Sequence, residues 1–438
     1  MDNFLNRMKA LLGDEYEAFL KFYNGDRFRG LRVNTLKCTA EKLRENLDFP
    51  LVPTPFCPDG YYIPADVVSP GNHPLHHAGA FYIQEPSATS AVEMLGVERG
   101  DRVLDLCAAP GGKSTQIGAK LQHTGLLWSN EIVKSRANIL LSNIERMGIR
   151  NAVVSSCHPE QLCRALAGRF DRVLVDAPCS GEGMFRKNSE AQREWSEEHV
   201  KSCAERQLHI LNSAKLALKA GGVMVYSTCT FSQEENEGVI TRFLAENPDF
   251  ALEDAGVSFG RQAMGYARRI FPMDGGEGHF AARLRKAGTL YCDDCAAPAE
   301  RPDERAMDEY RSLFPTLPFG GRVTVRGSKV IAFPAQYFET EGLPVLRAGV
   351  ILGEFVKNRF EPHHSAFMAA SPADCARCID LPCDGAAIRA FLHGEEIDAP
   401  AGCKGYTAVS VDGVTVGFGK ASGGRLKNKY PKGLRIKK

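Results

Sequence analysis

The strongest constraint on the fold is an alternation of short hydrophobic runs with longer helical segments between residues 80 and 285. The runs predicted as strands are 102–106, 126–130, 152–154, 170–175 and 223–227, followed by a later one at 278–284. We expect helices in the gaps, including 134–147 and about 199–219, which ends before Gly221-Gly222. Strands that alternate with helices build a parallel sheet covered on both faces. The sequence therefore predicts an α/β fold with a Rossmann-like, doubly wound sheet.

The length of 438 residues exceeds one ordinary core, so we expect two or three domains. The predicted divisions are a small α/β N-terminal domain at 1–75, the sheet domain at 76–288, a linker at 289–310 and a mixed or mostly β module at 311–438. In the first of these, apolar spacing over 4–22 indicates a helix broken near Gly13, and Thr39 can cap another helix.

Composition limits the cellular compartments in which we expect the chain. It has 44% hydrophobic and 24% charged residues, with no apolar run long enough to cross a membrane and no visible secretory signal. Its 14 cysteines are therefore expected to be thiols in a reducing compartment, and we predict a cytoplasmic protein without a membrane partner. Residues 420–438 hold eight Lys or Arg and no acidic residue. They are either a solvated end or a segment that contacts a phosphate backbone.

A Gly-rich turn follows the first strand of the predicted sheet. The chain reads Cys107-Ala108-Ala109-Pro110-Gly111-Gly112-Lys113, and Glu131 ends the next strand, where nucleotide-binding folds hold ribose hydroxyls. The turn lacks the G-x-G-x-x-G of dinucleotide sites, and Cys107 stands where a P-loop needs glycine. An adenosine with a sulfonium tail needs less from the loop than a triphosphate, so S-adenosylmethionine is the predicted cofactor.

Two cysteines follow two other strands of the sheet. Cys179 lies in Asp176-Ala177-Pro178-Cys179, and Cys229 ends Ser227-Thr228-Cys229. Carboxyl ends of parallel strands meet in one crevice. A thiolate added to carbon 6 of cytosine makes carbon 5 nucleophilic enough to take a methyl group, after which a second group must help elimination. Cys229, Cys179 and Asp176 suit this chemistry, and Lys113 is a candidate cation that lowers a thiol pKa.

These motifs resemble the Nop/Sun family of RNA 5-methylcytosine methyltransferases. The resembling segments are D-L-C-A-A-P-G-G-K-S, D-A-P-C-S-G-E-G and S-T-C-T, together with R-V-N-T-L at 32–36, Y-I-Q-E-P-S-A at 82–88 and G-G-E-G-H-F at 275–280. The resemblance implies that Cys229 is the nucleophile and that Cys179 helps release product. It also implies RNA rather than DNA as substrate, and cofactor contacts from 107–113, Glu131 and Asp176. Where the family often has an acidic residue near the adenine, this chain has His158.

Stretches at 349–354, 359–362 and 417–428 resemble a narrower group, the bacterial ribosomal small-subunit methyltransferases of the F type. This implies a PUA-like RNA-binding module and ribosomal RNA as partner. Separately from the resemblance, we expect a monomer. Two alternatives stay open, a transfer RNA methyltransferase and a non-catalytic RNA-binding or assembly factor. Cys292, Cys295, Cys375 and Cys378 form two Cys-x-x-Cys pairs, for which ordinary thiols are favoured over a metal site.

Overall fold

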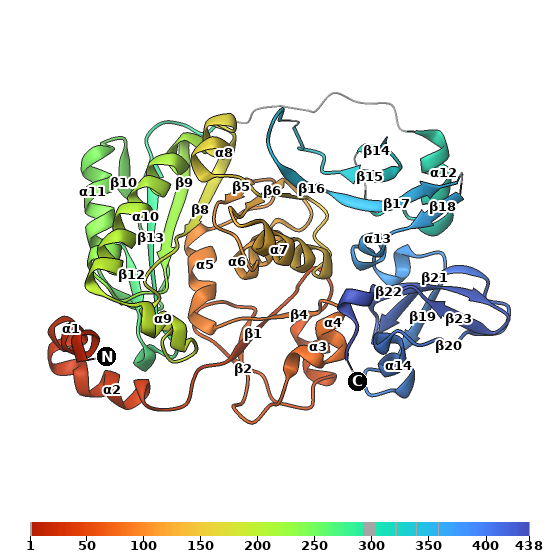
Figure 1. Ribbon diagram of the computed structural model, residues 1–438, viewed down its shortest axis with the longest axis horizontal. Coiled ribbons are helices and arrows are strands. Elements are labelled where there is room, and N and C mark those ends of the chain that lie inside the picture. Colours follow the sequence, from red (N-terminus) through yellow and green to blue (C-terminus); the bar gives the residue numbers. More distant parts are fainter. Residues whose placement is uncertain (1, 292–302, 320–321, 339, 358, 438) are drawn as a thin grey trace.

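The computed structural model describes residues 2–291, 303–319, 322–338, 340–357 and 359–437. Its largest sheet has ten strands in the order β11-β12-β13-β9-β8-β5-β6-β7-β16, with β10 paired to β13 (Figure 1). The strands of its centre are β5 (Arg102–Asp105), β6 (Leu126–Asn130), β7 (Ala152–Ser155), β8 (Phe170–Asp176) and β9 (Leu218–Thr228). These five are parallel, which confirms the predicted doubly wound sheet.

One side of the sheet is completed by antiparallel strands. The strand β13 (His279–Lys286) pairs with β9, as the later hydrophobic run predicted. The short strands β10 (Phe250–Leu252), β11 (Arg261–Gln262) and β12 (Arg268–Ile270) lie beside it. Register with β9 places Phe280 opposite Thr228, so β13 runs beside the Ser-Thr-Cys motif.

Helices cover both faces because successive strand residues point to opposite sides. Leu104 and Trp128 belong to one core, whereas Val103 and Leu127 belong to the other. The first core is covered by α8 (Pro159–Ala165), α10 (Glu197–Ala217) and α11 (Val239–Glu246), and the second by α5 (Ser90–Leu95), α6 (Gly112–Leu121) and α7 (Lys134–Arg146). The prediction that the long helix reaches residue 219 was wrong, because Leu218 already pairs with Phe170 in the sheet.

The N-terminal unit begins with α1 (Asp2–Leu12), the short turn η1 (Gly13–Glu15) and α2 (Tyr16–Tyr23), so the helix breaks at Gly13 as predicted. Its sheet has the order β2-β3-β1-β4. The elements are β1 (Gly30–Val33), α3 (Ala40–Glu45), β2 (Val52–Pro53), β3 (Gly60–Tyr62), α4 (Pro74–His77) and β4 (Phe81–Ile83). Since β4 pairs with β1, the predicted boundary at residue 75 falls inside this sheet.

The C-terminal part contains two sheets where a single module was predicted. The helix α12 (Glu304–Leu313) begins inside the predicted linker and packs on the first sheet. That sheet consists of β14 (Arg322–Arg326), β15 (Lys329–Phe333), β17 (Val350–Val356) and β18 (Arg359–Pro362). The second consists of β19 (Cys378–Leu381), β20 (Ile397–Asp398), β21 (Gly405–Val411), β22 (Val414–Ser422) and β23 (Arg425–Asn428). The helices α13 (His364–Met368) and α14 (Ala386–His393) accompany them.

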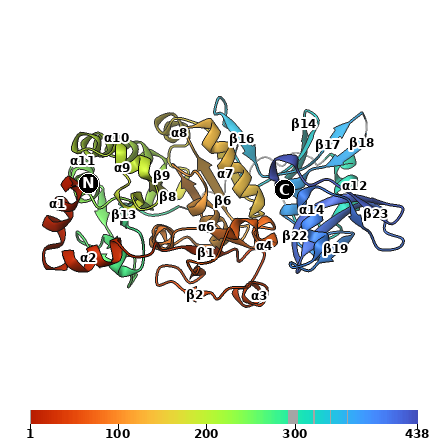
Figure 2. The same cartoon turned by 60° about the horizontal axis from the view of Figure 1, so that its bottom comes forward.

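Two contacts fix the C-terminal units to the rest of the chain. The strand β16 (Val345–Ala348) leaves its own unit and pairs antiparallel with β7 at the edge of the central sheet. The last sheet shares one core with the N-terminal unit, in which Leu31 and Val33 are grouped with Val409 and Leu426. The helices α1 and α2 and the C-terminal sheets lie at opposite ends of the molecule (Figure 2).

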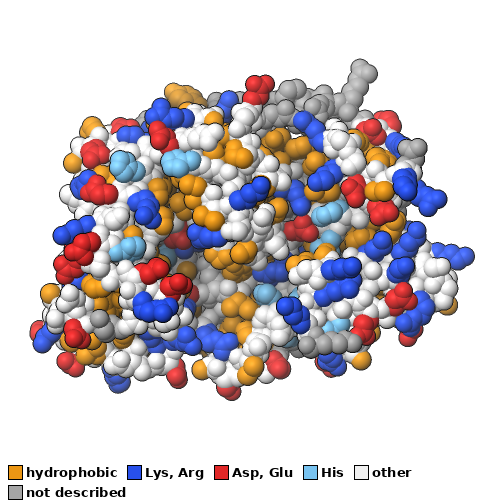
Figure 3. Space-filling model, in the orientation of Figure 1, with side chains coloured by type: hydrophobic (Ala, Val, Ile, Leu, Met, Phe, Trp, Pro, Cys, Tyr) orange, Lys and Arg blue, Asp and Glu red, His pale blue; other side chains and the backbone are white. Residues whose placement is uncertain are grey.

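The basic C-terminal segment does not form a free solvated end. Residues 420–422 lie in β22 and residues 425–428 in β23, and Tyr430 beyond them is 3% exposed. Several Lys and Arg side chains lie over the C-terminal units, at the right of Figure 3.

In the part of the chain that the structure describes, no helix is both long enough and apolar enough to span a bilayer. The remaining short helices are α9 (Ser189–Glu194), η2 (Pro70–Asn72), η3 (Pro86–Thr89), η4 (Glu182–Met184), η5 (Glu234–Gly238), η6 (Pro272–Asp274), η7 (Pro372–Asp374) and η8 (Lys432–Leu434).

Candidate active site

The two predicted thiols lie side by side. Cys179 follows β8 and Cys229 follows β9, and their Sγ atoms are 3.3 Å apart. The backbone of the second is fixed by Gly183, whose N–H donates to the Cys229 carbonyl at 2.9 Å. Contact with the Cys229 sulfur, followed by burial, raises the pKa of the Cys179 thiol well above its ordinary value. Cys179 is therefore held as a protonated thiol next to the other sulfur.

Both thiols line a cavity of about 960 Å³ at the carboxyl end of the sheet. This volume is at the upper end of the range for small-molecule sites. Of the residues predicted to contact a cofactor, those that line the cavity are Cys107, Ala109, Glu131, His158 and Asp176. Ile132 and Val133 also line it, with exposed fractions of 53% and 45%. Exposed apolar side chains beside a buried carboxylate suit an adenosine, whose aromatic base can pack its face on them and whose ribose carries hydroxyls.

The turn after β5 has a separate reason for each glycine. Gly111 has φ +113°, a conformation that side chains rarely adopt, and Gly112 begins α6. A Cβ on Gly112 would lie 3.2 Å from the Gln84 side chain of the N-terminal sheet. The buried Arg32 guanidinium donates to the Gly112 carbonyl at 2.9 Å and to Thr115 Oγ1 at 2.7 Å. The N-terminal unit thus supports this turn directly.

The rest of the predicted turn supports the cavity from its backbone. The Ala108 N–H donates to the Asn130 carbonyl at 2.8 Å, and Asn143 donates to the Pro110 carbonyl at 2.8 Å. Burial raises the pKa of the Cys107 thiol well above its ordinary value, so this cysteine stays a neutral lining group.

Asp176 is the charged centre of the site. Its carboxylate accepts hydrogen bonds from Lys113 Nζ and from Ser227 Oγ, both at 2.8 Å. Burial raises the pKa of Asp176, but Lys113 and the other polar neighbours outweigh it, and the net shift is downward. For Lys113, burial lowers the pKa and Asp176 more than offsets this, so its pKa is raised. Both groups are charged at neutral pH. Lys113 is bonded to Asp176, and its predicted effect on a thiol stays a prediction.

Glu131 and His158 lie at two positions around the cavity. Glu131 is 3% exposed, accepts from the Val133 N–H at 3.0 Å and pairs with Arg136 at 3.3 Å. His158 is exposed and caps α8, since its Nδ1 accepts from the Glu160 N–H at 3.3 Å. Its position on the rim is compatible with a cofactor contact, which stays a prediction.

Sequence reasoning gave no role to three polar residues of this site. Ser227 hydrogen-bonds Asp176, and its position in the Ser-Thr-Cys motif was a usable signal. Glu235 accepts from the Ser180 N–H at 2.9 Å and so holds the loop after Cys179, although nothing local in the sequence indicates this. His279 is 2% exposed, with Nε2 4.0 Å from Asp176 Oδ1, and burial lowers its pKa to about 3.

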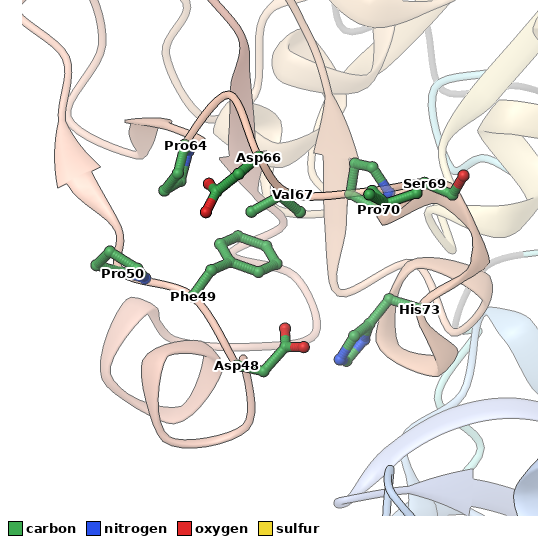
Figure 4. A pocket seen from close by; sticks show the side chains of 10 residues that line it. Asp48, Phe49, Pro50, Pro64, Asp66, Val67, Ser69, Pro70 and His73 are labelled. Atoms are coloured by element: carbon green, nitrogen blue, oxygen red, sulfur yellow. The ribbon is translucent and has the colours of Figure 1, made fainter.

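The remaining cysteines and a second cavity lie elsewhere. Cys375 Sγ contacts the Ser371 carbonyl and Cys378 Sγ contacts Ser410, while Cys292 and Cys295 fall outside the described residues. Among residues that the structure describes, no cluster of three metal-ligating side chains occurs. The second cavity, of about 660 Å³, lies in the N-terminal unit, and none of the predicted site residues lines it. Phe49 and His73 are among its lining residues (Figure 4).

Comparison with known proteins agrees with this arrangement along the chain. Residues 92–285 match the model of the 16S rRNA methyltransferase RsmB/F family, and residues 1–86 match the N-terminal domain of 16S rRNA methyltransferase RsmF. Residues 308–369 match the first C-terminal domain of RsmF, and residues 378–436 match the RsmF PUA domain. The two C-terminal matches coincide with the two C-terminal sheets.

Relatives match over nearly the whole length. The Ribosomal RNA small subunit methyltransferase F of Vibrio vulnificus is 34% identical, covering 99% of this chain and 97% of its own. That of Vibrio cholerae is also 34% identical and covers 93% of this chain and 91% of its own. The chain belongs to the ribosomal RNA small subunit methyltransferase F family. A solved methyltransferase homologue from Pyrococcus horikoshii has a TM-score of 0.59 and 27% identity to the present protein. The match covers 65% of the present chain and 95% of the homologue's chain.

Proposed function

We propose that this chain is an S-adenosylmethionine-dependent methyltransferase of small-subunit ribosomal RNA that methylates carbon 5 of cytosine through a covalent intermediate. Membership in the F family supports ribosomal RNA as the substrate. The observation that carries the chemistry is the pair of sulfurs, Cys179 and Cys229, 3.3 Å apart beside a cavity of about 960 Å³. A methyltransferase that attacked nitrogen or a hydroxyl would not need two adjacent thiols.

The cofactor site in this proposal is the part of the cavity formed by the Gly-rich turn. Glu131 would accept from the ribose hydroxyls, and the exposed faces of Ile132 and Val133 would contact the adenine. His158 would lie at the rim, and Cys107 with Ala109 would line the wall. When bound, S-adenosylmethionine supplies an electrophilic methyl group.

Cys229 is the proposed nucleophile. Its thiolate adds to carbon 6 of the cytosine, which leaves electron density at carbon 5 for methylation. The carbon 5 proton then passes to a water molecule, the electron pair of its bond re-forms the double bond between carbons 5 and 6, and the bond between Sγ and carbon 6 breaks to release Cys229 as a thiolate. Cys179, a protonated thiol against the same sulfur, assists by donating a hydrogen bond to the departing thiolate.

Asp176 is the proposed contact for the pyrimidine edge. Its carboxylate stays ionised because Lys113 offsets its burial, so it accepts a hydrogen bond from the exocyclic amine of cytosine. Uracil has a carbonyl oxygen at that position and would meet a second acceptor. The target base must leave its stack to reach this depth, which costs a few kcal/mol. In this proposal the N-terminal and C-terminal units bind the surrounding RNA, no DNA is a substrate, and the chain acts as a monomer.

The direct test is a pair of substitutions at the two sulfurs. We expect Cys229→Ala to abolish transfer of labelled methyl groups from S-adenosylmethionine to ribosomal RNA, because no nucleophile remains. We expect Cys179→Ala to accumulate a protein–RNA adduct that survives a denaturing gel, because elimination is blocked. Cys203→Ala, a buried cysteine outside the cavity lining, is the matched control and should keep activity. An adduct with Cys229→Ala and none with Cys179→Ala would reverse the two roles.

The identity of the RNA has its own test. Bisulfite sequencing of small-subunit ribosomal RNA and transfer RNA from a deletion strain should show 5-methylcytosine lost from ribosomal RNA alone. Loss confined to transfer RNA would replace the proposed substrate while leaving the chemistry intact.

A further inference from the structure

A small cavity of about 70 Å³ lies where the N-terminal unit, the central domain and both C-terminal units meet. Lys37 comes from the loop after β1, and His123 and Arg150 come from loops of the central domain. Ser371 follows α13, and Thr415 comes from the start of β22. This cavity shares no residue with the one that contains the two thiols.

Two polar atoms of its lining have no partner. Thr415 is 2% exposed and its Oγ1 makes no hydrogen bond to any described residue. The buried Nδ1 of His123 is likewise without a partner in the described part of the chain. Buried polar groups are nearly always hydrogen-bonded, and leaving one unpaired destabilises the fold. The cavity is several times larger than one water needs, so it has room for a polyatomic ligand.

The charge around the cavity is positive. Lys37 Nζ donates to two backbone carbonyls, Ala78 at 2.8 Å and Arg146 at 3.1 Å, which leaves one of its three protons free. No carboxylate pairs with Lys37 among the described residues. Burial, then the nearby Arg146 and Arg150, lower its pKa well below the ordinary value. A bound anion would favour the charged form of Lys37, because the described residues offer it no negative partner.

Arg150 adds charge but few free donors. Its Nε and Nη1 donate to the carbonyls of Ala369 and Pro318, and Nη2 is 3.7 Å from Asp374. Asp374 is itself occupied, because it accepts from Thr316 and from the Ser371 N–H. Lys37, Thr415 and, in its Nδ1–H tautomer, His123 therefore each have a donor in the lining without an acceptor among the described residues. Arg150 adds the N–H groups left at Nη2.

We propose that this cavity binds a phosphate group, held by Lys37 Nζ, His123 Nδ1 and Thr415 Oγ1. Phosphate oxygens accept several hydrogen bonds at once and carry the negative charge that the site lacks. The group is either inorganic phosphate or a backbone phosphate of the bound RNA. In both cases its binding joins the N-terminal unit to the central domain and to the last C-terminal sheet.

The first experiment measures binding of inorganic phosphate to the full-length protein by calorimetry at constant ionic strength, with chloride as the competing anion. We expect one site in the wild type, and about ten- to a hundredfold weaker binding in Lys37→Met, which loses a charged donor. Thr415→Val keeps the shape and should bind more weakly as well. Lys21→Met, at an exposed position on α2, should bind like the wild type.

The source of the phosphate is separated by adding ribosomal RNA. If an RNA backbone phosphate occupies the cavity, bound RNA abolishes the calorimetric signal of inorganic phosphate. In that case Lys37→Met also reduces the slope of the logarithm of the RNA-binding constant against the logarithm of salt concentration by about one. If free phosphate occupies it, both ligands bind together and the salt dependence is unchanged. Absence of phosphate binding to the wild type would overturn the proposal. So would binding as tight as the wild type's in both Lys37→Met and Thr415→Val, because either result would show that the cavity holds water only. This outcome is independent of methyl transfer.

Discussion

At the residue scale, the site depends on the charge balance between Lys113 and Asp176. The ammonium and carboxylate are 2.8 Å apart, with side-chain exposures of 11% and 31%. Without Lys113, burial would be the largest influence on the carboxyl group and would raise its pKa. A protonated Asp176 would be a weaker acceptor for the amine of cytosine in the proposed reaction, because the hydrogen bond would no longer be charge-assisted. Lys113 therefore acts by keeping its neighbour ionised.

Lys113→Met should move the acidic limb of the pH–rate profile to higher pH. The folded-state pKa of Asp176 is lowered by Lys113, so removing the ammonium raises that pKa and activity is lost sooner on acidification. We also expect methyl transfer at neutral pH to fall about tenfold or more, the effect of losing a charge-assisted hydrogen bond. Lys120→Met is the matched control, because Lys120 is on the same helix and pairs with Glu93 at 2.8 Å. An unshifted limb in Lys113→Met would contradict this role.

At the element scale, close packing of two backbone segments sets the position of Cys229, the proposed nucleophile. A Cβ on Gly183 would lie 2.9 Å from the Gly278 carbonyl and 3.0 Å from the Cys229 carbonyl. The loop after Cys179 can approach the ends of β9 and β13 this closely only with glycine at 183. Close packing therefore explains the glycine at position 183 in the motif that contains Cys179.

Gly183→Ala should reduce the rate of methyl transfer by about tenfold to a hundredfold, since displacing a reacting group by a fraction of an ångström is sufficient. Gly433→Ala, where a Cβ would meet nothing within 4 Å, should leave the rate unchanged. Single-turnover kinetics with both variants separates this step from RNA binding. Equal rates in the two variants would show that the loop adapts without moving Cys229.

A second test at this scale lies at the junction between β16, in the central sheet, and β17, in the first C-terminal sheet. Gly349 has φ +68°, and a Cβ there would lie 2.1 Å from the Ala332 carbonyl. We expect Gly349→Ala to lower the free energy of unfolding by about 2–5 kcal/mol, from backbone strain together with overpacking. Gly327→Ala shares the positive φ of +62° but meets nothing, and should cost about 1–2 kcal/mol. Urea denaturation measures both, and similar losses would contradict the packing argument.

These elements also show what sequence can and cannot reveal. Strands that end at Asp176 and Cys229 were predictable, because hydrophobic periodicity is local and parallel strands share one functional edge. The pairing of β16 with β7 joins residues nearly two hundred positions apart, and no local pattern encodes such a partner. His279 was within a recognised motif, yet its approach to Asp176 depends on the register between β13 and β9.

At the scale of the whole molecule, a half-buried histidine, His77, and a buried one, His364, lie where the N-terminal and C-terminal units meet. His77 Nδ1 is 3.0 Å from the Tyr430 hydroxyl, and the rings of His364 and Tyr430 are 5.5 Å apart. Burial, together with Arg146 for His77 and with His363 and Lys37 for His364, lowers the pKa of His77 to about 4 and that of His364 to about 3. The interface therefore favours the neutral form of both histidines.

This arrangement predicts that acid destabilises the association of the units. Between about pH 6.5 and pH 4 the unfolded chain binds protons at these histidines while the folded chain does not, so the free energy of unfolding falls as pH falls. Above pH 7 both states are neutral and the dependence on these groups disappears. We expect the urea midpoint to decrease from pH 7 to pH 5, with a smaller decrease in His364→Gln than in the wild type. His209→Gln, at an exposed position on α10, should follow the wild type. A wild-type midpoint that is constant over this range would mean that the interface accepts charged histidines.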